Sequence, residues 1–208
     1  MTTLVLIAKE TVAGRVKTRL NPPFSYEQAA ELAAAALADS LAAAESVPAE
    51  RRILLFEGNL LPPGSEHWDV MTQETGTLDR RLAAMFDAVE GPTLLIGMDT
   101  PQLTAADLTP VFEPWPNDVD AWFGPASDGG FWALALARPD GDLLRGIPMS
   151  QDDTGERQLD RLRGAGLEVA MLPELLDVDT VADARTVAEI APHTLFARRF
   201  RALESESA

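Results

Sequence analysis

A short segment near the amino end of the chain concentrates positive charge around a flexible glycine. Its relevant residues are Lys9, Gly14, Arg15, Lys17 and Arg19. Glycine lets the backbone approach a ligand closely, and the four cations can offset the charge of a di- or triphosphate. The pattern is typical of a phosphate cradle, although an ordinary solvated loop has the same composition.

Carboxylates stand at two other places where chemistry is expected. Asp99 follows an apolar run and precedes a proline, and a single residue separates Asp177 from Asp179. Residues two apart in an extended segment project to the same side, so this pair could face one cation. Because hard cations take oxygen ligands, we expect Asp99 and one of the pair to hold a divalent cation. Alternatively, Asp99 is an ordinary turn residue, and Asp177 and Asp179 offset the partial positive charge at the N-terminus of a helix.

A third acidic position lies in a glycine-rich turn, Ser127-Asp128-Gly129-Gly130, directly before an apolar run. The backbone NH groups and the carboxylate of such a segment can face a sugar or a base. Asp128 could then orient an acceptor or act as a general base. The same residues are also the commonest signal for a hairpin turn, which is the simpler interpretation.

Strand-like and helix-like patterns alternate along the whole chain. This order predicts one Rossmann-like α/β domain with a mainly parallel, mixed sheet and helices on both faces. The predicted strands are at 4–8, 53–56, 93–98, 119–123, 131–137 and 167–172, and the predicted helices are at about 26–47, 78–89, 104–110, 150–162 and 180–191. In such sheets ligands bind at the carboxyl ends of strands, where all the segments above fall.

The predicted domain spans residues 1–208, because no linker or shift in composition divides the chain. Residues 58–76 are predicted to be a polar loop. The tail, residues 194–208, is predicted to be peripheral and to form a short amphipathic helix that frays at its end. An apolar content of 46% is enough for a sizeable core.

Charge and composition exclude several classes of function. A formal charge of −16 repels nucleic acids and anionic membranes, so we expect no nucleic-acid partner. The first apolar run is too short for a signal sequence or a membrane span, and we expect a cytoplasmic protein. The chain has no cysteine, which excludes thiolate chemistry, and we interpret His67 and His193 as surface residues. No Gly-x-Gly-x-x-Gly pattern follows the first predicted strand, which argues against an NAD-dependent dehydrogenase.

Four motifs resemble a bacterial family, the DUF2064 or glycosyltransferase A-like group of the nucleotide-diphospho-sugar transferase superfamily. They lie at 14–20, 96–101, 124–130 and 177–180. The resemblance extends from about Leu4 to Val187 and implies a fold of the GT-A type. The guanylyltransferase for phospholactate and the molybdenum-cofactor nucleotidyltransferase are similar at the same places.

The resemblance implies roles for individual residues. The first loop would wrap a nucleotide, Asp99 would bind Mg²⁺ or Mn²⁺, and the Asp-x-Asp at 177–179 would be the later metal position. It adds Gln73, Gly76 and Arg81 to the nucleotide-facing residues. Two positions depart from the family pattern, since Thr11 replaces a proline and Gln102 replaces an acidic residue. The donor site therefore matches better than the acceptor site.

We expect a metal-dependent glycosyltransferase that moves a sugar from a nucleotide sugar to a small-molecule acceptor. Asp99, Asp128 and Lys17 are the residues expected to take part in the chemistry. The alternative is an NTP-dependent nucleotidyltransferase that releases pyrophosphate, and a third option is a non-catalytic nucleotide-binding module. A homodimer is compatible with the sequence.

Overall fold

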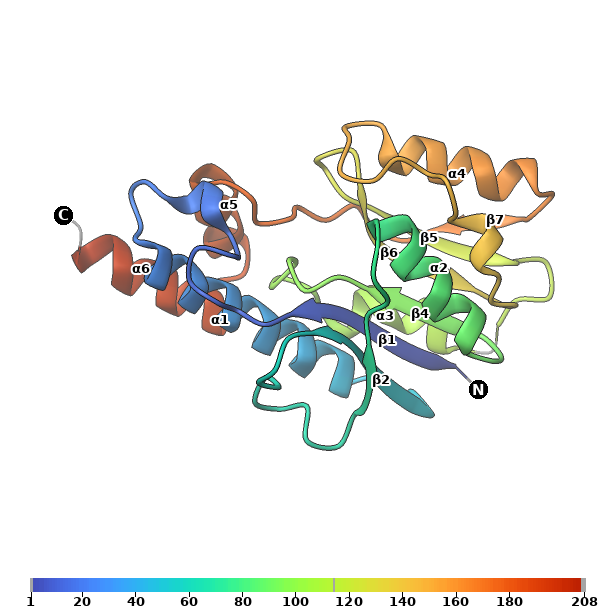
Figure 1. Cartoon of the computed structure of the whole chain (residues 1–208), viewed down its shortest axis with the longest axis horizontal. Helices are drawn as coiled ribbons and strands as arrows, with labels where there is room; N and C mark the ends of the chain where they lie inside the picture. Colours follow the sequence, from blue (N-terminus) through green and yellow to red (C-terminus); the bar gives the residue numbers. More distant parts are fainter. Residues whose placement is uncertain (1, 114, 207–208) are drawn as a thin grey trace.

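The fold is built on a mixed sheet of seven strands in the order β3-β2-β1-β4-β6-β5-β7, as the computed structural model shows (Figure 1). The structure describes residues 2–113 and 115–206. The strands are β1 (Thr3–Lys9), β2 (Arg51–Glu57), β3 (Asp69–Thr72), β4 (Thr93–Ile96), β5 (Ala121–Pro125), β6 (Phe131–Leu136) and β7 (Val169–Met171). Only β6 runs antiparallel to its neighbours, β4 and β5. The predicted α/β fold with a mainly parallel sheet is confirmed.

Helices cover both faces of the sheet. They are α1 (Tyr26–Glu45), α2 (Leu78–Ala88), α3 (Ala105–Phe112), α4 (Thr154–Gly164), α5 (Val181–Ile190) and α6 (Leu195–Glu206), with short 3₁₀ turns η1 (Thr18–Leu20) and η2 (Gly141–Leu143). Alternate side chains of β1 point to opposite faces. Leu4 and Leu6 pack in one core cluster with α1 and α3, and Val5 packs in another with α2, η2 and α4.

Capping residues fix where several helices begin. Ser25 accepts a hydrogen bond from the backbone of Gln28, whose side chain accepts one from the Ser25 backbone, so the predicted capping box is present. Thr180 and Asp183 form the same arrangement at the start of α5. These reciprocal bonds satisfy amide groups that would otherwise lack partners at a helix start.

The structure corrects three predicted boundaries. The predicted polar loop at 58–76 contains β3, a four-residue strand at the edge of the sheet. Its apolar Val70 is 49% exposed, so the sequence lacks the alternation of buried apolar and exposed polar residues that would predict a strand. Helix α4 begins at Thr154 rather than near 150, because Ser150 adopts a left-handed conformation with φ of 59°. Pro110 lies inside α3, which continues to Phe112.

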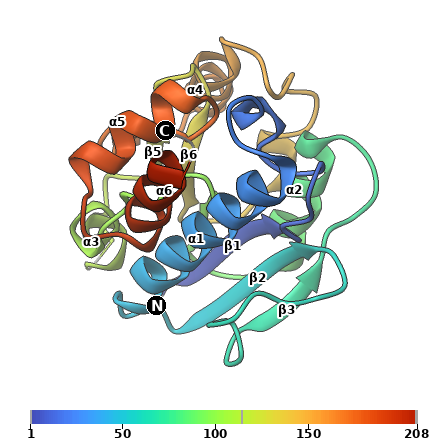
Figure 2. The same ribbon diagram turned by 90° about the vertical axis from the view of Figure 1, so that its left-hand side faces the viewer.

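The carboxyl-terminal helix is more than the peripheral tail that we predicted. Phe196 and Phe200 of α6 are each 1% exposed and pack in a cluster with residues of α1 and α5. Figure 2 shows α6 lying between α1 and α5, outside the sheet. This three-helix layer forms because the apolar stripe of α6 needs a partner surface, and α1 is long enough to extend past the strands. No helix in the described ranges is both long and apolar enough to cross a membrane.

Candidate functional site

The basic loop between β1 and α1 is anchored on both sides of Lys17. Val16 is 2% exposed and packs on Ala30 and Ala33 of α1, and Leu20 is fully buried beside Phe24. Lys17 itself has a left-handed backbone with φ of 45° and ψ of 39°. This conformation is uncommon for a residue with a side chain and is sustained here by the packing of its neighbours. As a result the lysine side chain points inward, not into solvent.

Lys17 is the centre of a cluster of ion pairs. Its Nζ lies 2.8 Å from Oδ1 of Asp99 and 3.0 Å from Oδ1 of Asp179, and its side chain is only 7% exposed. Arg19 donates to the other oxygen of Asp179 at 3.3 Å. Burial lowers the pKa of Lys17, but the attraction of the two carboxylates outweighs this effect and the pKa is raised. Lys17 is therefore firmly protonated.

The segment before α5 brings the late carboxylates to this cluster. Val178 donates its backbone NH to the carbonyl of Asp99 at 3.0 Å, and Ser127 donates to the carbonyl of Leu175 at 3.0 Å. The Gln102 side chain also donates to Leu176, at 2.8 Å. The segment thus runs between the end of β4 and the turn after β5. In sequence Gln102 stands out only as a departure from the family pattern, because its positioning role depends on a contact with a residue 74 positions away.

Asp177 has a different environment from Asp179. Its Oδ1 is buried and has no hydrogen-bond partner among the residues that the structure describes. Burial, reinforced by the negative charges of Asp99 and Asp128, raises the pKa of Asp177 to about 7. The positive charge of Lys17 lowers the pKa of Asp177 and partly offsets this rise. The two aspartates of the Asp-x-Asp motif are thus both near Asp99, but Lys17 neutralises Asp179 directly and Asp177 only at a distance.

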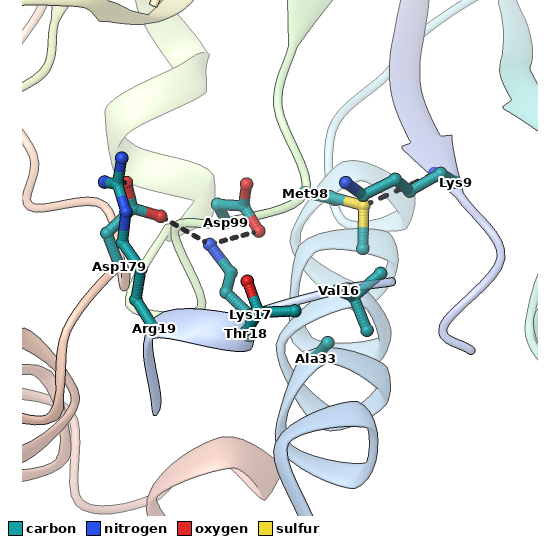
Figure 3. Close-up of a pocket in the computed structure, with 9 residues that line it drawn as sticks. All are labelled: Lys9, Val16, Lys17, Thr18, Arg19, Ala33, Met98, Asp99 and Asp179. Atoms are coloured by element: carbon teal, nitrogen blue, oxygen red, sulfur yellow. Dashed lines mark hydrogen bonds and ion pairs between the residues drawn. The ribbon is translucent and has the colours of Figure 1, made fainter. Parts of the chain in front are cut away.

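A cavity of about 170 Å³ opens beside these ion pairs. Its lining residues are Lys9, Val16, Lys17, Thr18, Arg19, Ala33, Met98, Asp99 and Asp179. Figure 3 shows the Lys17 side chain extending between the two carboxylates, with Lys9 and Met98 on the other side of the cavity. The Lys9 backbone NH contacts the Met98 sulfur at 3.4 Å, which joins the ends of β1 and β4. Met98 and Thr18 were not among the predicted site residues.

The predicted nucleotide-facing residues before and within α2, Gln73, Gly76 and Arg81, form a separate network. Gln73 donates to the carbonyls of Ala8 and Leu55 at 2.9 and 3.2 Å, and its oxygen accepts from Arg81 at 3.2 Å. Arg81 also bonds the carbonyl of Gly76 and pairs with Glu57 at 2.5 Å. The three residues lie at the carboxyl ends of β1 and β2. They do not line the cavity, and they are already bonded to one another or to the backbone.

Four further predicted residues also lie outside the cavity lining, namely Asp177, described above, and Gly14, Arg15 and Asp128. Gly14 has φ of 74° and Arg15 is exposed, both in the outer part of the basic loop. Asp128 is exposed in the turn between β5 and β6, where its Oδ1 accepts a hydrogen bond from Gly130 at 2.9 Å. The hairpin interpretation of this turn is thus correct, since β5 and β6 pair antiparallel. Asp128 is nevertheless close enough to Asp177 to influence its pKa.

The carboxylates fit a hard divalent cation in chemical type. Asp99 and Asp179 share one ammonium, and the buried Asp177 oxygen lacks a donor, so each offers an oxygen that a cation could neutralise. Within residues 2–113 and 115–206, no three acidic or histidine side chains already converge as ligands. A cation at this position would have to replace the ammonium of Lys17.

Sequence comparison assigns the chain to a family. Residues 29–151 match the family described as "Uncharacterized protein conserved in bacteria (DUF2064)". The chain belongs to the DUF2064 family. The matched region contains Asp99, Asp128 and the α2 network, and the basic loop and the Asp-x-Asp segment lie outside it. Among curated proteins, none matches the chain in sequence.

Solved structures share the fold of this DUF2064 member. A candidate nucleotide-diphospho-sugar transferase from Desulfovibrio desulfuricans G20 superposes with a TM-score of 0.82 at 24% identity, covering 98% of this chain and 94% of that one. A CMP:2-keto-3-deoxy-manno-octonic acid synthetase complexed with CTP has a TM-score of 0.55 at 13% identity, with coverages of 92% and 98%. The 2-C-methyl-D-erythritol 4-phosphate cytidylyltransferase from Thermus thermophilus also has a TM-score of 0.55, at 16% identity, with coverages of 90% and 98%. At these identities the likeness establishes the fold.

Proposed function

We propose that this DUF2064 protein is a divalent-cation-dependent transferase that uses a nucleotide sugar as donor and a small molecule as acceptor. The observation that carries the proposal is the meeting of Lys17 and Arg19 with Asp99 and Asp179 at the carboxyl ends of β1 and β4. In an α/β sheet this edge is where ligands bind. A strongly acidic chain that gathers cations beside carboxylates at this edge is suited to a phosphorylated ligand held partly through a metal.

Different side chains of the site would bind the phosphate oxygens and the metal. Lys9, Lys17 and Arg19 line the cavity and can donate to phosphate oxygens. Asp99 and Asp179, with Asp177 beside them, would hold Mg²⁺ or Mn²⁺, which would offset the charge that develops on a departing nucleoside diphosphate. Asp128 stands at the exposed end of the same edge and could orient an acceptor hydroxyl or take its proton.

Nucleotidyl transfer is the second candidate. It is favoured by the cytidylyltransferases among the solved structures with this fold, and by a synthetase of the same fold that was solved with CTP. The same cations and carboxylates would then serve an NTP, whose α-phosphorus is attacked with loss of pyrophosphate. The two reactions leave different products, since glycosyl transfer releases a nucleoside diphosphate.

A thermal-shift panel of NTPs and nucleotide sugars, each with and without Mg²⁺ or Mn²⁺, tests the proposal. A ligand present at about 100 times its dissociation constant should stabilise the protein by roughly 2.7 kcal/mol. We expect a shift that requires the metal and is lost in Asp99→Asn. Incubation of the best ligand with candidate acceptors, followed by assay for nucleoside diphosphate or pyrophosphate, separates the two reactions. No shift with any nucleotide would refute both.

A further inference from the structure

The Lys17 ammonium lies within ion-pair distance of the carboxylates of both Asp99 and Asp179. We propose that the Lys17 ammonium and a divalent cation compete for these two carboxylates, an inference that rests on the proposed function. A nucleotide phosphate that draws Lys17 away would then admit the cation. Metal and nucleotide would therefore bind cooperatively, with Lys17 as the residue that couples them.

The distances make it unfavourable for Lys17 Nζ and a divalent cation to contact Asp99 and Asp179 at the same time. Nζ lies within 3.0 Å of an Oδ1 atom on each carboxylate. Magnesium binds oxygen at about 2.1 Å, so an ion bound to both oxygen atoms would lie next to Nζ. Two cations in contact, in a place where the lysine side chain is only 7% exposed, repel each other with little screening. One of them has to leave.

The charges of the four side chains that form these ion pairs already balance. Asp99 and Asp179 carry two negative charges, and Lys17 and Arg19 carry two positive charges in direct contact with them. A further cation gains little net attraction from such a cluster. A bound diphosphate changes the balance, because it adds negative charge and offers Nζ new acceptors in the cavity that Lys17 already lines.

The loop can remain fixed as the side chain moves. Val16 and Leu20 are buried on either side of Lys17 and hold its backbone in the left-handed conformation. The four-carbon stem of lysine has enough rotatable bonds to carry Nζ from the carboxylates into the cavity. Lys17 thus has two sets of acceptors within reach of a single backbone position.

Mn²⁺ binding without nucleotide tests the competition directly. Free Mn²⁺ is measured by electron paramagnetic resonance in titrations of the wild-type protein and Lys17→Met. We expect Lys17→Met to bind Mn²⁺ at least about tenfold more tightly, because the carboxylates are freed. In Lys17→Met/Asp99→Asn the gain should disappear. Equal or weaker binding by Lys17→Met, or no binding by either protein, would overturn the proposal.

Lys9→Met is the matched control. Lys9 ends β1, directly before the loop that carries Lys17, and lines the same cavity, but no ion pair of Lys9 occurs in the described ranges. Its replacement removes one positive charge without freeing a carboxylate. Its Mn²⁺ affinity should therefore rise much less than that of Lys17→Met. An equal gain in both variants would mean that general electrostatics, rather than competition at Asp99 and Asp179, explains the effect.

The chain contains only two lysines, Lys9 and Lys17, which gives a second test that needs no substitution. Amine-selective labelling of the wild-type protein, read by mass spectrometry, reports on both. Mn²⁺ should increase labelling of Lys17 at least about twofold as it displaces Nζ from the carboxylates, with Lys9 as internal reference. Unchanged Lys17 labelling at the highest Mn²⁺ concentration would contradict the competition, including in the case that Lys17→Met does not fold.

These experiments separate failure of the inference from failure of the proposed function. Neither uses a nucleotide or a turnover assay. Competition without any nucleotide-dependent thermal shift would refute the transferase and leave the role of Lys17 intact. Metal-dependent nucleotide binding without competition would refute the role of Lys17 and leave the transferase intact.

Discussion

Lys17 donates a hydrogen bond to Asp179 at 3.0 Å, although 162 positions separate the two residues in sequence. The bond closes the site by joining the first loop of the chain to the segment that precedes α5. It depends on the backbone bond from Val178 to Asp99, which holds that segment against the end of β4.

Replacing Asp99 with asparagine should abolish metal-dependent nucleotide binding. The amide keeps the shape of the side chain but removes the charge that a cation and Lys17 require. If the transfer reaction is found, its rate should fall by about 100-fold or more, as for loss of one strong electrostatic contact. The measurement is the metal-dependent thermal shift, followed by kcat.

Asp69→Asn is a suitable control for Asp99→Asn. Asp69 pairs with Arg51 at 2.6 Å, and both side chains are more than half exposed. Exposed pairs contribute less than about 1 kcal/mol, so its stability and nucleotide binding should stay near those of the wild-type protein. Equal loss of binding in the two variants would count against a specific role for Asp99.

Asp177→Asn should stabilise the protein above neutral pH. The pKa of Asp177 is raised to about 7, so the folded state holds its proton more tightly than the unfolded state does. As pH rises from about 4 to 7, the unfolded carboxyl ionises first, and this group withdraws stability on the order of 3 kcal/mol. Asparagine cannot ionise and avoids the loss. Urea unfolding at pH 5 and pH 8 should show the larger gain at pH 8.

Asp118→Asn provides the comparison for Asp177→Asn, since Asp118 is an exposed carboxylate in the loop before β5. Its effect on the free energy of unfolding should be small and similar at both pH values. A pH-independent effect of Asp177→Asn would mean that the pKa of Asp177 is not raised in the folded protein.

Gly129→Ala should destabilise the protein far more than Gly146→Ala. Both glycines have left-handed backbones, with φ of 87° and 79°, so alanine strains both by about 1 kcal/mol. A Cβ at Gly129 would lie 1.9 Å from the carbonyl oxygen of Asp152, whereas at Gly146 nothing lies within 4 Å. We expect an additional cost of about 2 kcal/mol or more at Gly129 in chemical unfolding. Equal costs would mean that the loop at 148–153 moves away freely.

Phe200→Ala should cost about 3–5 kcal/mol of stability, because a buried aromatic side chain is removed from the layer of α1, α5 and α6. Phe200 is 1% exposed and packs edge-to-face on Phe24 with ring centroids 5.6 Å apart. Leu195→Ala, on the same helix but 47% exposed, should cost less than about 1 kcal/mol. Similar small effects for both would restore the view of α6 as a peripheral tail.

The sequence alone determined the alternation of strands and helices, because the periodicity of buried side chains differs between the two and is a local property. It also placed Lys17, Asp99 and Asp179 in segments that follow predicted strands. It did not predict β3, an exposed edge strand with little apolar signal, or the buried packing of α6, which depends on the surface that α1 and α5 offer.

Only the tertiary structure decided which charges meet. Nothing local distinguishes Lys17, buried between two carboxylates, from Arg15, which is exposed two residues earlier. The left-handed backbone at Lys17 and the bond from Val178 to Asp99 make that difference. Likewise, Asp177 and Asp179 look equivalent in sequence, yet one oxygen of Asp177 is buried without a partner and Asp179 is paired. Burial and pairing depend on segments far apart in the chain, which local patterns do not encode.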